Sequence, residues 1–455
     1  MDRRSFVRTG AASLAAGWTL PRWPTGSALA RPVPSAPQLA WQREELALFL
    51  HFGVNTFTDR EWGDGRESPT IFDPARLDAR QWARTARAAG FRALILTAKH
   101  HDGFCLWPSA TTRHSVASSP WRGGGGDVVR EFVDACAAEG LRAGLYLSPW
   151  DRNHPTYGDT PAYNDVYTAQ LTELLTRYGR IAEVWFDGAN GEGPNGRRQV
   201  YDWPRVFGLV RRLQPEAVIF SDAGPDVRWC GNERGVAGDP NWSTVDPAVV
   251  SFPGQSGTGV EAALQHGHQA GTVWRPAEVD VSIRPGWFYH PAQDARVRTV
   301  ENLVELYFSS VGRNSKLLLN VPPTRDGLIH DVDAARLTGF RVRRDELFGD
   351  PLELRPVELR PPGRGGGGAE WELRRPAAPR IARLAEDITR GQRVAAYRLE
   401  GLQDGSWRVL ATGSTIGYAK LDRLAAGSPL QRIRVVIEKS VEQPEPVRLQ
   451  LFERA

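Results

Sequence analysis

Residues 77–102, LDARQWARTARAAGFRALILTAKHHD, contain the alternation that decides the fold expected for this chain. Leu77 to Gly90 has apolar residues at helical spacing and ends on a glycine, which commonly follows the last turn of a helix. Phe91 to Thr97 is an apolar run of strand length, and the polar triplet His100-His101-Asp102 follows soon after it. A helix that leads into a buried strand is the repeating unit of a parallel sheet covered by helices.

The same alternation recurs on both sides of this stretch. Further strands are expected at 46–53, 141–147, 182–186, 217–220 and 316–321, and further helices at 128–139, 162–178, 203–213 and 296–311. Residues 222–290 are rich in Gly, Pro and Trp, and the two remaining strands are expected near Val249 and Val279. A chain of 455 residues suits a (β/α)8 TIM-like barrel followed by a smaller module, which we assign to residues 31–346 and 347–455.

The character of the sequence changes near Leu347. Four prolines between 351 and 362 lead into the glycine run 365–368, and short alternating runs follow at 393–399, 432–438 and 446–453. Alternation of apolar and polar residues in short runs is typical of antiparallel strands. We therefore predict a C-terminal antiparallel β-sandwich domain.

The first thirty residues resemble a Tat-type signal peptide. Arg3-Arg4-Ser5-Phe6-Val7 is a twin-arginine pattern, an apolar stretch follows, and Ala28-Leu29-Ala30 has the small residues of a cleavage site. We predict that residues 1–30 are a signal peptide and that the mature protein is periplasmic or secreted. The alternative is a basic start to a cytoplasmic domain.

Composition narrows the class of protein. Hydrophobic residues make up 41% and charged residues 24%, which is a globular balance without a membrane span. Removing residues 1–30 removes four arginines and one aspartate, and the formal net charge falls from +4 to +1. Such a balance gives no reason to expect a nucleic-acid partner. Three scattered cysteines do not suggest a disulfide framework or a zinc cluster, and nothing in the sequence specifies an oligomeric state.

Polar residues stand at or just beyond the carboxyl ends of the predicted strands. They are His51, the triplet His100-His101-Asp102, Ser148, Asp187 and Asp222. Barrel enzymes build their active sites on this face, so one pocket could gather all of these side chains.

Asp187 is the clearest single candidate for chemistry. The apolar strand Val184-Trp185-Phe186 delivers this carboxylate directly into a Gly-rich turn, although an aspartate there could also cap the next segment. Retaining glycosidases need a second carboxyl group about 5 to 5.5 Å away. Spacing does not choose among the available partners, which are Asp102, Asp151, Asp222, Asp226, Glu233 and Asp239.

Histidines near the strand ends raise the question of a metal. His51, His100 and His101 are residue types that bind zinc in hydrolases. Neighbouring side chains on a strand point to opposite faces, which argues against convergence of His100 and His101 on one ion. Hydrogen bonding to sugar hydroxyls is the interpretation we favour, with no metal expected. Many of the sixteen tryptophans fall in predicted loops, where their faces could stack on sugar rings.

Several long motifs occur together, in one order, between residues 40 and 455. They are His51-Phe52-Gly53-Val54-Asn55-Thr56-Phe57, Lys99-His100-His101-Asp102-Gly103-Phe104-Cys105-Leu106-Trp107, Leu145-Tyr146-Leu147-Ser148-Pro149-Trp150-Asp151, Glu183-Val184-Trp185-Phe186-Asp187-Gly188, Gly231-Asn232-Glu233 and Ser282-Ile283-Arg284-Pro285-Gly286-Trp287-Phe288-Tyr289. With these motifs the chain resembles the α-L-fucosidases of glycoside hydrolase family 29. It is most similar to the subfamily associated with α-1,3/1,4-linked fucose on branched glycans.

The resemblance implies a retaining α-L-fucosidase that releases terminal fucose from fucosylated oligosaccharides or glycoconjugates without a cofactor. Asp187 then matches the nucleophile of the Trp-Phe-Asp-Gly motif, and Glu233 matches the acid/base, 46 residues later. The fucose-binding residues implied in the same way are His51, Glu61, Trp62, His100, His101, Tyr146, Trp185 and Trp287.

Two other functions are compatible with parts of the sequence. A metal-dependent deacylase centred on His100, His101 and Asp102 would lose activity with a chelator and would be indifferent to Asp187→Asn. A glycan-binding module with an inactive site would bind fucosides without turnover, although both carboxylates are present here.

Overall fold

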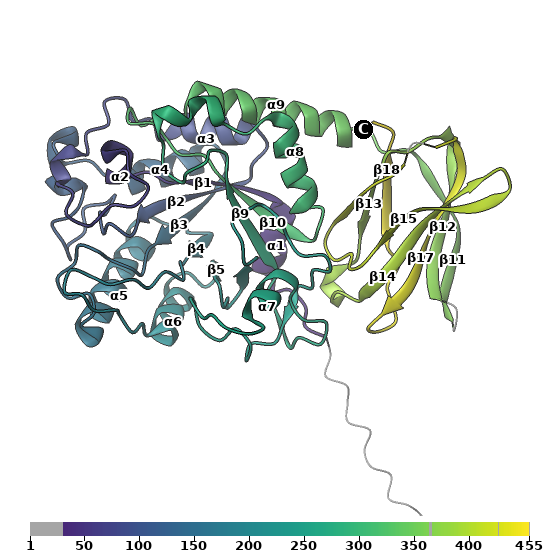
Figure 1. The fold of residues 1–455 in the computed structure, drawn as a ribbon, viewed down its shortest axis with the longest axis horizontal. Helices are drawn as coiled ribbons and strands as arrows, with labels where there is room; N and C mark the ends of the chain where they lie inside the picture. The colour runs from purple at the N-terminus through teal and green to yellow at the C-terminus, as the bar shows by residue number, and fades with distance from the viewer. Residues whose placement is uncertain (1–30, 364–365, 426, 455) are drawn as a thin grey trace, which may run out of the picture. The chain divides into compact units, whose positions relative to one another are not determined.

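The computed structural model describes residues 31–363, 366–425 and 427–454; the predicted signal peptide, residues 1–30, lies outside the described residues. Within residues 31–363, eight parallel strands close into a barrel in the spatial order β1-β10-β9-β6-β5-β4-β3-β2 (Figure 1). They are β1 (Leu46–Leu50), β2 (Ala93–Lys99), β3 (Arg142–Leu147), β4 (Glu183–Trp185), β5 (Val218–Ser221), β6 (Val227–Trp229), β9 (Ala277–Ser282) and β10 (Ser315–Asn320). The predicted TIM-like barrel is confirmed.

The strands are apolar throughout because both of their faces are buried. In β1, Leu48 packs outward in the core shared with the helices, while Phe49 packs in the barrel interior. The neighbouring strand β2 divides in the same way, with Leu96 outside and Ile95 inside. Strands buried on two faces read as continuous apolar runs instead of alternating ones, which explains why they stood out in the sequence.

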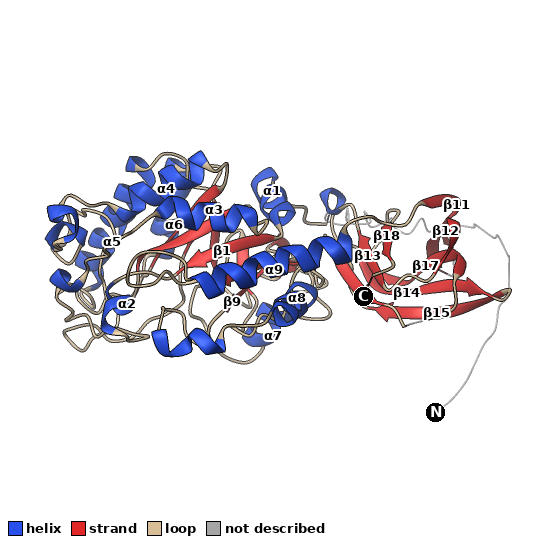
Figure 2. Cartoon of the chain, turned by 90° about the horizontal axis from the view of Figure 1, so that it is seen from above, coloured by secondary structure: helices blue, strands red, loops and turns tan. Residues whose placement is uncertain are grey.

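Helices cover the outside of the barrel (Figure 2). They are α1 (Ala36–Glu44), α2 (Val54–Thr58), α3 (Ala79–Ala88), α4 (Val128–Ala138), α5 (Thr160–Arg177), α6 (Trp203–Leu213), α7 (Val260–His266), α8 (Val300–Ser309) and α9 (Asp331–Phe348). Five of them, α3 to α6 and α8, confirm predicted helices to within a few residues. The carboxylate of Asp78 caps α3 by accepting from Gln81 N at 3.0 Å, and Asp127 caps α4 in the same way.

The strand expected near Val249 is wrong, whereas the one near Val279 is confirmed as β9. Val249 lies in the long connection between β7 (Thr244–Val245) and β8 (Val273–Trp274), two short strands that pair antiparallel. The missing barrel strand is β6, which follows β5 after the short described stretch 222–226 with no helix between them. Its central residue is Arg228, whose buried guanidinium donates to the backbone oxygen of Leu264 at 3.0 Å. A charged residue in so short a strand hides the apolar pattern.

The described part of the C-terminal region forms two antiparallel sheets, and the predicted β-sandwich is confirmed. The five-stranded sheet has the order β11 (Leu354–Gly363), β12 (Gly366–Ala377), β17 (Leu430–Ser440), β14 (Val394–Gln403) and β15 (Ser406–Gly413). The three-stranded sheet has the order β16 (Lys420–Arg423), β13 (Ile381–Ala385) and β18 (Arg448–Phe452). Leu384, Leu399 and Ile433 lie in the core between them.

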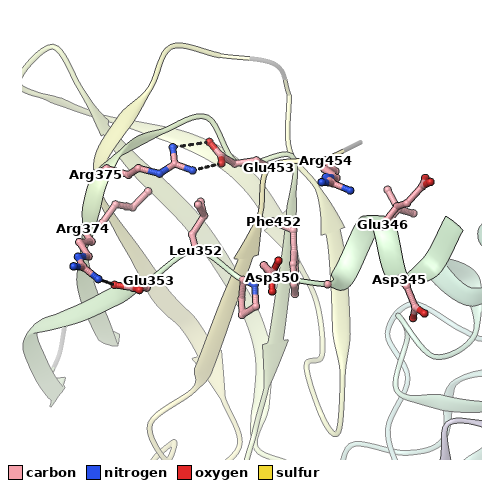
Figure 3. Close-up of a pocket in the computed structure, with 14 residues that line it drawn as sticks. Asp345, Glu346, Asp350, Leu352, Glu353, Arg374, Arg375, Phe452, Glu453 and Arg454 are labelled. Carbon is pink, nitrogen blue, oxygen red and sulfur yellow. Dashed lines mark hydrogen bonds and ion pairs between the residues drawn. The ribbon is translucent and has the colours of Figure 1, made fainter. Parts of the chain in front are cut away.

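A pocket of about 600 Å³ lies where α9 ends and the β-sandwich begins (Figure 3). Arginines on its rim pair with acidic neighbours, Arg374 with Glu353 and Arg375 with Glu453. Because its lining is mixed in charge and none of it comes from the carboxyl ends of the barrel strands, we separate this pocket from the candidate active site.

The β-sandwich also supplies a partner for a barrel residue that is largely buried. Glu45, directly before β1, forms an ion pair with Arg383 of β13, and both side chains are about 20% exposed or less. Burial alone would raise the pKa of Glu45, but the charge and hydrogen bonds of Arg383, with the hydroxyls of Tyr307 and Tyr418, lower it. The β-sandwich therefore supports the barrel at this point.

We expect Arg383→Met to lower the free energy of unfolding by about 3 kcal/mol, because it leaves the Glu45 carboxylate without its cation. Equilibrium unfolding in urea would measure this. Arg374→Met is the matched control, since Arg374 and Glu353 are both exposed and such pairs contribute less than about 1 kcal/mol. The difference in unfolding free energy between the two variants should be fully present above the ordinary pKa of a glutamate. It should vanish as the pH falls through the lowered pKa of Glu45. Equal losses for the two variants would contradict a supporting role.

None of the helices in the described residues is both long and apolar enough to cross a membrane.

Candidate active site

The carboxyl ends of β1, β2 and β4 bring aromatic and polar side chains together. His51 follows β1, His100 and His101 follow β2, and Asp187 follows β4 after one intervening residue. The ring centres of His51 and His100 lie 5.5 Å apart, and those of His100 and His101 lie 4.1 Å apart. The prediction that these residues share one pocket at this face is therefore consistent with the fold.

His51 is held as a neutral ring. Its Nδ1 lies 2.8 Å from Oδ1 of Asn320, the last residue of β10. Burial lowers the pKa of His51 to about 3, although this hydrogen bond favours the protonated form. Because the amide oxygen only accepts, Nδ1 carries the hydrogen and Nε2 keeps its lone pair.

His101 is oriented by a short chain of hydrogen bonds. Ser148 Oγ donates to the backbone oxygen of Trp150 at 2.7 Å, so it has only lone pairs left for Nδ1 of His101, also at 2.7 Å. His101 Nδ1 must then be the donor, and its Nε2 lies 3.8 Å from Asp187 Oδ2. Burial lowers the pKa of His101 while the Asp187 charge acts in the opposite direction.

His100 is buried, and burial followed by the nearby His101 and His51 holds its pKa well below the ordinary value. Among the described residues its Nδ1 has no hydrogen-bond partner. A buried polar atom without a partner costs free energy unless a ligand or water completes it. Asp102 Oδ2 lies 3.9 Å from this nitrogen, beyond hydrogen-bonding distance.

Asp187 is positioned by two donors from neighbouring elements. Tyr146 of β3 donates its hydroxyl to Oδ2 at 3.1 Å, and the backbone N–H of Ala189 donates to Oδ1 at 2.7 Å. The side chain remains 28% exposed, so a ligand can reach it. Gly188 is required next to it, because a Cβ there would lie 2.1 Å from Oδ2 of Asp222.

Trp185 and Tyr146 belong to the barrel interior beneath this carboxylate. Their rings are 5.1 Å apart, and Trp185 stacks on Phe220 of β5 at 4.1 Å. The indole N–H of Trp185 donates to Glu278 Oε1 at 3.0 Å. Burial, and then the charge of Glu183, raise the pKa of Glu278 well above its ordinary value. The Glu278 side chain fixes the indole from below.

Glu233 lies on the exposed loop after β6. Its Oε2 accepts from the indole N–H of Trp287 at 3.3 Å. Partial burial raises the pKa of Glu233, the Trp287 hydrogen bond lowers it, and the charges of Asp187 and Glu61 raise it further. Glu233 therefore lies close enough to Asp187 for the charge of that carboxylate to raise the Glu233 pKa.

Glu61 and Trp62, predicted to bind substrate, come from the loop after α2. Trp62 is 57% exposed, and its ring lies 5.9 Å from the ring of His101 in a T-shaped arrangement. The Glu61 carboxylate accepts from the backbone N–H groups of Trp287 and Phe288. Glu61 therefore holds the loop that carries Trp287.

Other carboxylates that spacing alone could not exclude have structural partners. Asp151 is buried against Lys99 Nζ at 3.1 Å, Asp226 pairs with Arg211, and Asp239 pairs with Lys420 at 2.6 Å. Burial raises the pKa of Asp102 to about 7, and that of Asp222 to about 6. Asp222, beside Gly188, is thus the remaining competitor near Asp187.

The described residues hold no group of three or more His, Cys, Asp or Glu side chains that could bind a metal ion. The three cysteines, Cys105, Cys136 and Cys230, are free and buried.

Several residues of the site were not predicted from the sequence. Asp280 of β9 accepts from the Trp229 indole at 2.7 Å, and burial and then Glu233 raise its pKa well above the ordinary value. Glu278 and Asp280 alternate with Val279 and Val281 inside a buried strand. Acidic residues at alternate positions of an otherwise apolar strand are the signal that could have found them.

Comparisons with known proteins agree with this geometry. Residues 54–340 match the family model described as alpha-L-fucosidase. Alpha-L-fucosidase 1 of Arabidopsis thaliana is 42% identical over 443 residues, which is 91% of this chain and 86% of the relative.

Solved structures give the same result. SpGH29 is 41% identical with a TM-score of 0.87, covering 93% of this chain and 99% of that one. A Ruminococcus gnavus GH29 fucosidase in complex with fucose is 30% identical with a TM-score of 0.83, covering 95% of this chain and 97% of that one. With a family model that spans more than half of the sequence and relatives that match along most of their length, the chain belongs to the α-L-fucosidases of glycoside hydrolase family 29.

Proposed function

We propose that this α-L-fucosidase is a retaining, exo-acting enzyme that hydrolyses terminal α-1,3/1,4-linked L-fucose through a covalent intermediate. The observation that carries the proposal is the difference between the environments of two carboxyl groups. Asp187 accepts two hydrogen bonds at the end of β4, while the pKa of Glu233 is raised by burial and by the charge of Asp187. One ionised and one protonated carboxyl group are what the retaining mechanism needs.

In the first step an Asp187 oxygen attacks the anomeric carbon as the bond to the leaving oxygen breaks. Glu233 gives its proton to that oxygen, so the aglycone leaves as an alcohol and the fucosyl group stays on Asp187. In the second step Glu233 takes a proton from water, the water oxygen attacks the anomeric carbon, and the Asp187 carboxylate is released. Two inversions leave the anomeric configuration unchanged.

The surrounding side chains are suited to bind one neutral sugar. His51, His100 and His101 have lowered pKa values and are neutral, so each ring can donate from one nitrogen and accept at the other. The Tyr146 hydroxyl holds Asp187 ready for attack, and Trp185, Trp62 and Trp287 supply aromatic faces.

The linkage preference is supported by the Gly231-Asn232-Glu233 segment and the Trp287 motif, which resemble the subfamily acting on branched glycans. Proton NMR of the wild-type reaction would test both parts of the proposal. Oligosaccharides with α-1,2, α-1,3, α-1,4 and α-1,6 fucose should show faster release for the 1,3 and 1,4 linkages, with α-fucose as the first product. Initial formation of β-fucose would exclude retention, and equal rates on all linkages would exclude the preference.

We also propose that residues 1–30 direct export, because the twin arginines, apolar stretch and small-residue site occur in the required order. Replacing Arg3 and Arg4 by lysine should leave fucosidase activity in the cytoplasmic fraction of the host. Unchanged export of that variant would contradict the proposal.

A further inference from the structure

One histidine outside the predicted site bridges two carboxylates beside it. His290 Nδ1 lies 2.8 Å from Asp59 Oδ1, and His290 Nε2 lies 3.1 Å from Glu61 Oε2. The ring is only 13% exposed. Asp59 and Glu61 follow α2, whereas His290 lies more than 200 residues later, beyond β9. The ring therefore joins two loops that are far apart in the sequence.

Each ring nitrogen of His290 faces a carboxylate oxygen within hydrogen-bond distance. Glu61 is itself an acceptor at both oxygens, since Oε1 accepts from Trp287 N and Oε2 accepts from Phe288 N at 3.4 Å. His290 therefore connects Asp59 to the carboxylate that holds the Trp287 loop, by one contact at each ring nitrogen.

These contacts continue to the proposed acid/base. Glu61 holds the backbone of Trp287, and the indole of Trp287 donates to Glu233 Oε2 at 3.3 Å. Glu233 itself lies on an exposed loop. The orientation of its carboxyl group therefore depends on how firmly the Trp287 loop is held.

We propose that Asp59 and His290 form a clamp that positions Glu233 for proton transfer, acting through Glu61 and Trp287. The inference rests on the proposed role of Glu233 and assigns no chemical step to His290, which is a positioning residue. General acid catalysis requires the proton donor within hydrogen-bond reach of the leaving oxygen, so a small displacement of Glu233 reduces it.

A positioning role predicts a dependence on the leaving group that a merely structural role does not. Phenolate is a poor leaving group and needs the proton, whereas 2,4-dinitrophenolate departs without help. Loosening the clamp should slow cleavage of phenyl α-L-fucoside and spare 2,4-dinitrophenyl α-L-fucoside. A general loss of folding or of fucose binding would lower both rates by the same factor.

The experiment compares kcat/KM of the full-length enzyme on these two fucosides. We expect His290→Ala to lose about tenfold on the phenyl substrate and less than about threefold on the dinitrophenyl substrate. Asp59→Asn should shift the same ratio by a smaller amount. It is the safer variant for folding, because Asp59 is 49% exposed with φ of 58° and asparagine tolerates that conformation. His268→Ala is the matched control, since that half-buried ring accepts from Asp246 N and lies outside the clamp.

Glu233→Ala in the same assay separates the clamp hypothesis from the assignment of Glu233 as the general acid. If Glu233→Ala loses more kcat/KM on the phenyl than on the dinitrophenyl substrate and neither clamp variant does, the clamp hypothesis is wrong. The assignment of Glu233 as the acid then stands. If Glu233→Ala itself loses both substrates equally, the assignment of the acid is wrong, and the positioning role is overturned with it.

Discussion

We expect Asp187→Asn to lose fucose release from every α-L-fucoside by a factor on the order of 10⁴ or more, which is typical when a group acting directly on the reacting atoms is removed. The amide has the shape of the carboxylate but neither its charge nor its nucleophilicity. The single amide oxygen can still accept from the Ala189 N–H, and the Tyr146 hydroxyl, which rotates, can accept from the amide NH2, so the variant should fold. Loss of the nucleophile affects good and poor leaving groups alike.

Fucose release measured with aryl and oligosaccharide substrates would test this prediction. Asp134→Asn is the matched control, because its side chain is 65% exposed on α4, away from the strand ends. Asp222→Asn is the informative comparison, since this carboxyl group lies beside Gly188. If Asp222→Asn were inactive while Asp187→Asn kept full turnover, the nucleophile would be Asp222.

The second large effect is expected for Glu233→Ala. Loss of a general acid typically costs about 10² to 10⁴ in rate, and we expect that loss on oligosaccharides and phenyl α-L-fucoside. On 2,4-dinitrophenyl α-L-fucoside the first step needs no proton, so the covalent intermediate should accumulate. Azide should then restore turnover and yield fucosyl azide, because an anionic nucleophile needs no general base.

The pH dependence of Glu233→Ala provides a second readout. Burial and the Asp187 charge raise the pKa of Glu233, so wild type keeps its acid protonated to higher pH. Wild-type kcat/KM should fall as the pH rises through that pKa, because the carboxyl group is then ionised. The fall should be absent from Glu233→Ala on the dinitrophenyl substrate. Glu216→Ala, an exposed glutamate before β5, should behave like wild type. Persistence of the alkaline fall in Glu233→Ala would assign it to another group.

Prediction from sequence succeeded where local pattern and burial agree. The strand Ala93–Lys99 is buried on both faces, so its apolar run was visible without knowledge of its neighbours. It failed for Val227–Trp229, where a buried arginine interrupts a strand of three residues. The long-range partners that satisfy Arg228, such as the Leu264 carbonyl, cannot be seen in the local pattern.

In the candidate site, too, some features could be predicted from the sequence and others only from the structure. Asp187 follows a short apolar strand, so its place at the carboxyl end was predictable. Glu61 stays a predicted sugar contact, and only the structure shows that its carboxylate also accepts from the backbone of Trp287, 226 residues later. Glu278 and Asp280 were overlooked because only closure of the barrel turns one face of β9 inward.

The sequence by itself determined the alternation of strands and helices, the polar residues at strand ends and the motifs shared with α-L-fucosidases, since each depends on residues that are neighbours in the chain. Only the tertiary structure decided which carboxyl groups are paired structurally, which histidines are neutral and what orients Glu233. The pKa of a carboxyl group depends on burial and on charges brought near by folding. The contacts of His290 with Asp59 and Glu61, made across more than 200 residues, show why such properties follow from the fold.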